Sequence, residues 1–482
     1  MKKPTLKFDF KTRHAGVSAI TTIAVAAGLI IINILAAELD IQADLTPKKL
    51  FSLTAPTIEL LDGLDSEVEI LALFKPGEEP EAIMESVNEY DRNSDRVSVS
   101  VIDPDRNPGV VSRFSEDDKP IPMGSIIVSS GGNFRVIGAM DLYDISRNQQ
   151  GQPQIMGQKV EQQITSAIAY VSSGRTPKIL EITGHRESPL ASQGYSSLLD
   201  QANYELGEIS LIREDIPGGT ALVTLIGPRS DLSEAEANKL DEYLAGGGSL
   251  LVALDLTQEP LTVIEDMLER WDIRVRRGLV LEGRQNRLIA EFGDNPIVFA
   301  PFMTDHEALA PLAEARMNPI IQATMGFRRT EAEQRQLEYF PILTSSEDSR
   351  LRTDISSAGS GDLAPLPSDE MGPIDVAAAV RQRNLDTYQP EGGTIVVIGS
   401  ASTLAGLRSL GQIKDNADMV LNLVNWAVND ETAVNVSSKS LFRLPLRIGN
   451  LTAVIYAAVA IILIPLICVV SGLFIFFRRR NR

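Results

Sequence analysis

The chain has 482 residues, with 45 Lys and Arg against 64 Asp and Glu, and a single cysteine. At about 100–200 residues per domain, this length predicts two to four domains. Hydrophobic residues at 44% and charged residues at 23% are typical of a folded protein, which excludes global disorder. The net charge of −19 argues against a nucleic-acid-binding protein, because such proteins carry a basic patch. One cysteine excludes an internal disulfide and a zinc site built from several cysteines.

Two long apolar segments lie near opposite ends of the chain. Residues 15–37 contain no charged side chain, and residues 452–477 form a second uncharged run that includes Pro465. About 20 apolar residues in a helix suffice to cross a bilayer, so each segment is predicted to be a transmembrane helix. A cleaved signal peptide is the alternative for the first segment. Its apolar run exceeds the usual ~7–15 residues, and no A-x-A pattern ends it, so a membrane anchor is favoured.

Basic residues flank both apolar segments on their outer sides. Residues 1–14 contain five Lys or Arg and one Asp, and residues 478–482 contain four Arg. Positive charge stays in the cytoplasm, so both termini are predicted to be cytoplasmic tails at a bacterial inner membrane, with residues 38–451 extracytoplasmic. Without the charges of the two tails, the total of −19 becomes −27 for residues 38–451. That charge repels anionic lipid and nucleic acid alike.

Residues 44–145 are predicted to form a thioredoxin-like α/β domain. Strands are expected at 68–74 and at 97–103, where apolar and polar residues alternate, with a helix at about 80–93 between them. Gly131-Gly132-Asn133 predicts a hairpin turn between two further strands. The Cys-x-x-Cys motif of a redox enzyme is absent, so this domain is expected to lack redox activity.

Residues 157–440 are predicted to form a Rossmann- or flavodoxin-like domain, entered through a helix at about 157–172. Apolar strands are expected at four places: 178–183, 221–228, 249–255 and 394–400. Helices are expected between and after them, at about 190–203, 234–246 and 417–428. Ser233 and Glu236 fit a capping box at the start of the second helix. Strands alternating with helices favour a parallel sheet covered on both faces, and the Ser-, Gly-, Asp- and Pro-rich residues 344–372 predict a flexible loop.

Two motifs resemble ligand-binding loops without matching them. Gly246-Gly247-Gly248 follows a helix and precedes a strand, which is the reverse of a phosphate-binding loop, and no G-x-x-x-x-G-K-[ST] motif occurs. The segment from Asp103 to Gly109 has Pro108 where a calcium-binding EF-hand loop needs glycine, and Phe114 where it needs glutamate. We therefore predict no ATP hydrolysis by this chain, no metal site and no cofactor.

The candidate site follows the strand at 178–183. Ligands of open parallel sheets bind just beyond the carboxyl ends of strands, so the candidate contacts for a ligand or partner are Gly184, His185, Arg186 and Glu187. His185 with Glu181 or Glu187 is also suited to acid–base catalysis, and a turn with a purely structural role is a third interpretation. No G-x-S-x-G motif occurs, and the only cysteine, Cys468, lies in the second apolar segment, so no nucleophilic catalysis is expected.

Seven stretches, in order along the chain, resemble the GldG-like family, an auxiliary component of an ABC-type transport system associated with gliding motility. They are DLTPKKLFSLTAPTIELLDGLDSEVEI (44–70), VIDPDRNP (101–108), VEQQITSAIAYV (160–171), KILEITGHRES (178–188), LIGPRSDLSEAEANKLDEYLAGGGSLLVALD (225–255), TIVVIGSAS (394–402) and NLVNWAVNDE (422–431). The family usually has Thr-Gly-His-Gly-Glu after the strand at 178–183, whereas here Arg186 replaces the second glycine. The resemblance implies no catalytic residue.

The resemblance implies a noncatalytic, membrane-anchored subunit that works with a separate permease and a separate ATP-binding subunit. The small residues Ala24, Ala26, Ala27 and Gly28 of the first apolar segment are expected to pack against the permease. Two competing hypotheses remain open. One is an extracytoplasmic hydrolase or transferase that acts on envelope glycans through His185, and the other is a glycan or peptide receptor unconnected with transport.

Overall fold

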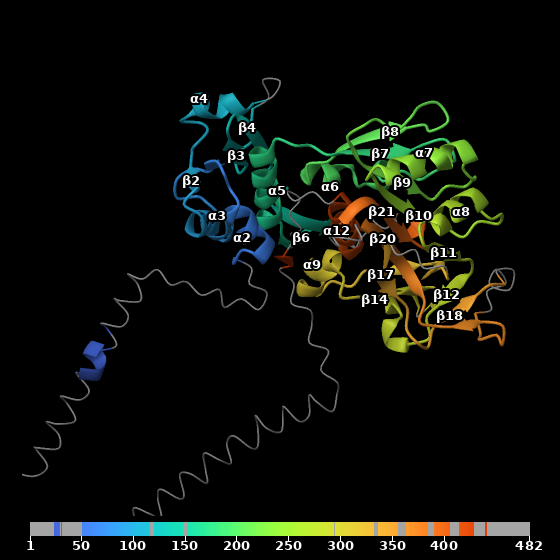
Figure 1. Ribbon diagram of the computed structural model, residues 1–482. Helices are drawn as coiled ribbons and strands as arrows, with labels where there is room; N and C mark the ends of the chain where they lie inside the picture. Colours follow the sequence, from blue (N-terminus) through green and yellow to red (C-terminus); the bar gives the residue numbers. More distant parts are fainter. Residues whose placement is uncertain are drawn as a thin grey trace, which may run out of the picture.

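The computed structural model shows a mixed α/β protein in two halves, each centred on a sheet (Figure 1). The structure describes residues 24–28, 30, 51–115, 120–147, 152–293, 295–331, 336–354, 363–383, 390–404, 414–428 and 439–440.

The N-terminal half is built on a four-stranded sheet with the order β2-β1-β3-β4. Its strands are β1 (Val68–Ala72), β2 (Val97–Val101), β3 (Ile126–Ser130) and β4 (Asn133–Ile137). β1 and β2 run parallel, whereas β3 is antiparallel to both β1 and β4. The main core lies between one face of this sheet and the helices α2 (Ala55–Asp62), α3 (Glu81–Asn93) and α5 (Val160–Ser173). A smaller cluster on the other face includes α4 (Pro108–Val111) and η1 (Ser112–Phe114).

A buried carboxylate ties α2 to this core. One oxygen of Glu161 on α5 accepts hydrogen bonds from the backbone nitrogen of Thr54 at 2.6 Å and from the hydroxyls of Thr54 and Thr57, each at 2.8 Å. Thr54 is the N-cap of α2, and a proline stands in the first helical turn. Glu161 therefore takes the place of the acidic residue of a capping box, although it belongs to another helix.

A small three-stranded sheet follows the N-terminal domain in the chain. It has the order β22-β6-β5, with the strands β5 (Tyr143–Arg147), β6 (Pro153–Gln158) and β22 (Lys439–Ser440). The pairing of β22 with β6 brings the last described residues of the chain back to the N-terminal half (Figure 1). The sequence did not predict this sheet, because its strands are short and mostly polar.

The second half is built on a ten-stranded mixed sheet. Its main path is β11-β16-β20-β21-β10-β9-β7-β8, and β17 pairs with β20 and with β14. The strands are β7 (Lys178–Ile182), β8 (Glu205–Ile209), β9 (Thr220–Ile226), β10 (Ser249–Ala253), β11 (Ile273–Arg276), β14 (Phe302–Met303), β16 (Gly326–Arg329), β17 (Leu337–Thr344), β20 (Asp375–Arg383) and β21 (Pro390–Ile398). Neighbours from β21 to β8 are parallel, whereas those from β21 to β11 are antiparallel.

Helices cover both faces of the large sheet. One core cluster contains residues of α7 (Glu234–Ala245) and α8 (Thr262–Arg270), and the other contains residues of α6 (Ser196–Gln201), α9 (Ala310–Glu314) and α12 (Lys414–Val428). Successive side chains of β9 alternate between them: Leu222 and Ile226 belong to one cluster, and Val223 and Leu225 to the other. Burial on both faces explains why the central strands read as continuous apolar runs.

Two parts of the predicted fold need correction. The sheet is not purely parallel, because residues 273–383 add antiparallel strands along one side. The two flanking transmembrane helices are also contradicted: no helix among the described residues is long and apolar enough to cross a membrane. Of the segments 15–37 and 452–477, only the short helical stretch 24–28 and residue 30 are described, and the rest lies outside the described residues.

The segment 344–372, predicted to be a flexible loop, contains ordered structure on both sides of residues 355–362, which lie outside the described part. It contributes β18 (Arg350–Arg352) and β19 (Glu370–Met371), which form a three-stranded sheet with β12 (Leu279–Leu281). The side chains of Arg352 and Asp369 are each about 1% exposed and form a double ion pair of 3.0 and 2.8 Å. This buried pair organises a segment whose polar composition indicates a loop.

Candidate functional site

The candidate residues lie in the turn after β7, at the carboxyl edge of the parallel part of the sheet. β7 pairs with β8 and β9, and Ile182 stands opposite Ile209. The backbone nitrogen of Arg229, after β9, donates to the carbonyl of His185 at 2.8 Å. A Cβ atom built on Gly184 would lie 3.5 Å from the side chain of Ile212, after β8. The loops that follow the three strands therefore meet at this turn.

His185 is held between two carboxylates. Its Nδ1 lies 3.0 Å from Oε1 of Glu187, and its Nε2 lies 3.3 Å from Oε1 of Glu236. The three side chains are 6%, 3% and 4% exposed, respectively. The other oxygen of Glu187 accepts from the backbone nitrogens of Gly184 at 3.1 Å and His185 at 2.8 Å. The contact of Nδ1 with Glu187 is a hydrogen bond, whereas Oε1 of Glu236 lies beside Nε2 without a hydrogen-bond partner among the described residues.

Glu236 connects this cluster to the start of α7. Its Oε2 accepts from the backbone nitrogen of Ser233 at 2.9 Å and from its hydroxyl at 2.8 Å, and the Ser233 hydroxyl accepts from the Glu236 backbone, which confirms the predicted capping box. Burial alone would raise the pKa of Glu236. The hydrogen bonds from Ser233 and the proximity of His185 outweigh that effect and lower the pKa below its usual value.

The backbone of the turn is constrained at two positions. Gly184 has φ 132° and Arg186 has φ 61°, both in the range that favours glycine. Arg186 therefore occupies a left-handed conformation at the position where the GldG-like pattern has its second glycine. Gly184 and Arg186 are exposed, whereas His185 is buried, so the turn presents one pair of residues to solvent and encloses the other.

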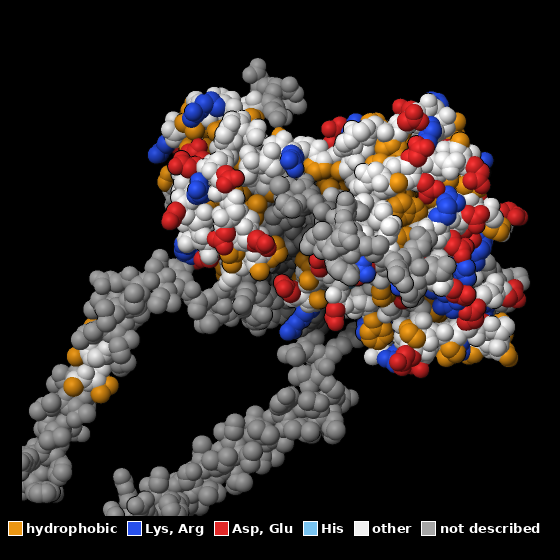
Figure 2. All heavy atoms as spheres, viewed as in Figure 1, with side chains coloured by type: hydrophobic (Ala, Val, Ile, Leu, Met, Phe, Trp, Pro, Cys, Tyr) orange, Lys and Arg blue, Asp and Glu red, His pale blue; other side chains and the backbone are white. Residues whose placement is uncertain are grey.

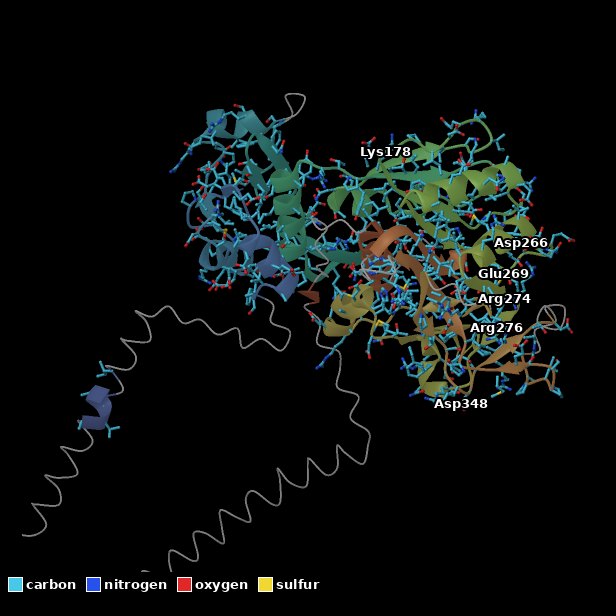
Figure 3. All side chains as sticks on the ribbon, viewed as in Figure 1. Lys178, Asp266, Glu269, Arg274, Arg276 and Asp348 are labelled. Carbon is cyan, nitrogen blue, oxygen red and sulfur yellow. The ribbon has the colours of Figure 1, made fainter. Side chains whose placement is uncertain are left out.

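Glu181, the other predicted acid–base partner of His185, interacts elsewhere. Both oxygens of its carboxylate lie 3.3 Å from the backbone nitrogen of Ala191, and the hydrogen bonds and ion pairs of His185 are made to other residues. Burial raises its pKa, and the charge of Glu208 adds to that effect. Lys178 lies at the far end of β7 (Figure 3) and pairs with Glu205 at 3.9 Å.

Sequence reasoning missed the partnership of Glu236 with His185. The Ser-x-x-Glu spacing identified Glu236 as a capping residue, because that interaction is local. Its second oxygen meets an imidazole that lies 51 positions earlier in the chain, and no local pattern reports such a contact.

The second histidine of the described residues, His306, belongs to a separate aromatic cluster. Its ring meets Trp426 edge-on at 4.6 Å and Phe340 at 5.2 Å between centroids, and Nδ1 accepts from the backbone of Ala308. Burial lowers the pKa of His306 to about 4. Within the described ranges no group of three or more His, Cys, Asp or Glu is arranged to hold a metal ion.

The predicted membrane-packing residues are not part of this site. Ala24, Ala26 and Ala27 are exposed, and a Cβ atom built on Gly28 would meet no other atom within 4 Å. On the face shown in Figure 2, acidic and basic side chains are interspersed over both halves, which differs from the basic patch of a nucleic-acid-binding surface.

Two family models match the chain. One, described as an ABC-type uncharacterized transport system, matches residues 176–423 and so covers just over half of the chain. The other, a domain of unknown function (DUF7088), matches residues 47–132. A search of curated proteins finds no match.

Some solved structures are distantly similar. The mmIFT52 N-terminal domain is 16% identical, with 52% of this chain and 97% of that chain covered and a TM-score of 0.35. A putative ThuA-like protein from Bacteroides uniformis is 10% identical, with 54% and 96% covered and a TM-score of 0.30. An exo-β-1,4-mannosidase from an Opitutaceae bacterium is 10% identical, with 72% and 48% covered and a TM-score of 0.28. Likenesses this weak carry no argument about function.

Proposed function

The chain belongs to the family described as an ABC-type uncharacterized transport system, and on that premise we propose that it is a noncatalytic subunit of an ABC transporter. Family membership gives it an auxiliary role in transport. The proposal adds that a separate permease and a separate ATP-binding subunit are its partners, and that it belongs to the GldG-like branch. The exposed residues Gly184 and Arg186 are the contacts we propose for a partner or substrate.

The enclosure of His185 is the observation that carries the noncatalytic role. A general base must offer a free nitrogen to substrate within hydrogen-bond reach. Here Glu187 and Glu236 face the two ring nitrogens at 3.0 and 3.3 Å, and the side chain is 6% exposed. This arrangement supports a histidine that positions the turn, and it counts against a hydrolase or transferase that uses His185. No feature of the described residues favours a receptor unconnected with transport.

Co-purification tests the proposal. The full chain, tagged and extracted in a mild detergent from its native cells, is expected to bring down an ATP-binding subunit and a multi-span permease in stable ratio. A sample extracted with a harsh detergent, which separates subunits, controls for nonspecific capture. Repeated isolation of the folded chain without either subunit would contradict the proposal.

A second experiment separates positioning from catalysis. We expect His185→Ala to weaken partner binding, because the turn that presents Gly184 and Arg186 loses its support, and to leave the transport rate per assembled complex unchanged. Transport abolished by a variant with native circular dichroism and native partner binding would instead indicate a direct part in the chemistry.

We also propose that the body lies on the extracytoplasmic side of the membrane. The charge of −27 on residues 38–451, which disfavours contact with anionic lipid, supports this placement. Protease added to intact spheroplasts is expected to cleave the body, and lysed spheroplasts provide the positive control. Protection in intact spheroplasts combined with cleavage after lysis would contradict the placement.

A further inference from the structure

The outer edge of β2 pairs with no other described strand. β2 is the last strand of its sheet and pairs with β1 alone among the described strands. In a parallel pair of strands, every second residue of a strand directs its backbone N–H and C=O groups toward the neighbouring strand. The carbonyl of Arg96 accepts from Val68, and the nitrogen of Ile102 donates to Ala72. The even-numbered residues therefore face β1, so Val99 and Val101 point their backbone groups outward.

This edge lacks the charged side chains that are found on the edge strands β4, β8 and β11. In most proteins, charged side chains, a proline or a bulge on an edge strand prevent it from pairing with another chain. β4 carries Arg135, and β8 carries Glu205 and Glu208. β11 carries Arg274 and Arg276, which lie beside α8 (Figure 3) and are ion-paired to Glu269 and Glu370. The sequence of β2, Val-Ser-Val-Ser-Val, contains neither charge nor proline, and its pairing with β1 has no bulge.

The sequence of β2 is also palindromic, with Val99 at its centre. If two copies pair antiparallel about a two-fold axis through Val99, Val97 stands opposite Val101 and Ser98 stands opposite Ser100. Val99 then exchanges both backbone hydrogen bonds with Val99 of the second copy. The nitrogen of Val97 already donates to Ser94, but its carbonyl is available to the nitrogen of Val101. The same pairing places valine against valine on one face and serine against serine on the other.

From these observations we propose that β2 is a homodimerisation edge, which pairs with β2 of a second copy to form a continuous eight-stranded sheet. Figure 1 places β2 on the side of the N-terminal half that faces away from the larger half, so the larger half does not block the approach. The inference goes beyond the proposed transport role and does not depend on it. A pair of five-residue strands buries less area than the ~800 Å² per partner of a stable interface, so the dimer is expected to be weak and concentration-dependent.

Cysteine cross-linking tests both the pairing and its register. In this arrangement positions 98 and 100 of opposite copies form a non-hydrogen-bonded pair with Cα atoms about 4.5 Å apart, within disulfide range. Two full-length chains are prepared in a Cys468→Ser background, one with Ser98→Cys and one with Ser100→Cys. Both serines are exposed, so both variants are expected to fold. We expect the mixture to form at least ~10-fold more disulfide-linked dimer than either variant alone.

The design includes a control and opposing outcomes. A mixture of Glu205→Cys and Glu208→Cys chains, which places the thiols on the acidic edge strand β8, is expected to show no such enhancement. Pairing is also expected to disappear with Val99→Pro, because the lost N–H points away from β1 and the sheet itself is retained. Equal cross-linking by the single variants, no cross-linking of folded chains, or cross-linking of position 98 only to another subunit would overturn the proposal. Because no readout depends on transport, its failure is distinguishable from failure of the proposed function.

Discussion

Replacing His185 with alanine removes the group that separates two buried carboxylates. In the native turn the imidazole lies 3.0 Å from Glu187 and 3.3 Å from Glu236, and these two carboxylate side chains are 3% and 4% exposed. The variant leaves both carboxylates in a water-poor environment without their shared partner. It also frees the turn from the start of α7, because His185 bridges these two elements.

The expected cost follows from the interactions that are lost. A hydrogen bond to a charged group contributes about 1.5–3 kcal/mol, and a buried polar group left without its partner costs about 1–3 kcal/mol. Water that enters the space left by the imidazole offsets part of this cost. We therefore expect His185→Ala to lower the free energy of unfolding of the second half by about 3 kcal/mol at pH 7.

The loss of unfolding free energy in His185→Ala is expected to depend on pH, through the carboxylate of Glu236. The pKa of Glu236 lies below its usual value of 4.5 in the folded chain, partly because of His185. A carboxylate with a lowered pKa contributes stability that is present above its unfolded pKa and is lost as the pH falls through its folded pKa. The part of the stability difference that comes from Glu236 is therefore expected to be present at pH 4.5 and just above it, and to be lost as the pH falls further.

Urea unfolding followed by tryptophan fluorescence measures this difference. The chain has two tryptophans, Trp271 and Trp426, and both lie in the second half, so their fluorescence reports on the half that contains the turn. Arg229→Ala, an exposed substitution in the adjacent loop, serves as the control and is expected to change stability by less than about 0.5 kcal/mol. An unchanged midpoint for His185→Ala, or a loss equal at pH 7 and pH 4, would refute the reasoning.

Three further predictions concern other residues. Arg186→Gly is expected to stabilise the chain by about 1 kcal/mol in urea titrations, because it relieves the left-handed conformation at φ 61°; a loss of stability would contradict the strain, and Arg229→Gly is the control. Burial lowers the pKa of His306 from 6.5 to about 4. The free energy of unfolding of the native chain is therefore expected to fall by about 2 kcal/mol relative to that of His306→Gln as the pH falls from 6.5 to 4. The same pH dependence of unfolding in both chains would contradict this. Glu161→Ala is expected to increase amide hydrogen exchange in α2 at least tenfold while α12 is unchanged, and equal exchange in both helices would argue against a local role.

The central strands could be predicted because their signal is local. Burial on both faces requires continuous apolar runs, and the strands expected from such runs are present as β1, β7, β9, β10 and β21. The edge strand β2 was predicted from a different local signal, the alternation of valine and serine. The turn at Gly131 and Gly132 was predicted for a similar reason, since both residues have positive φ and join β3 to β4. The capping box at Ser233 depends on residues three positions apart.

The antiparallel side of the large sheet could not be predicted in the same way. β16 has the sequence Gly-Phe-Arg-Arg, in which two of the four residues are charged, and it meets β20 at a single register pair, Phe327 with Asp375. β20 is rich in alanine, a residue that favours helices, and only its burial between β17 and β21 makes it a strand. These strands are specified by their neighbours, as is the meeting of His185 with Glu236.

The contacts between the two halves are polar, which bears on whether the His185 turn and the edge of β2 act independently. The apolar clusters of the N-terminal half and of the second half share no residue, and the join between α5 and the end of α6 is polar. Gln163 donates to Gln201 at 2.9 Å, and Asn203 donates to the carbonyl of Ser166 at 2.7 Å. Polar interfaces of this kind resemble those between separable domains. A perturbation of the His185 turn is therefore expected to leave pairing at β2 intact, and loss of dimerisation in a folded His185→Ala chain would contradict the separation of the two surfaces.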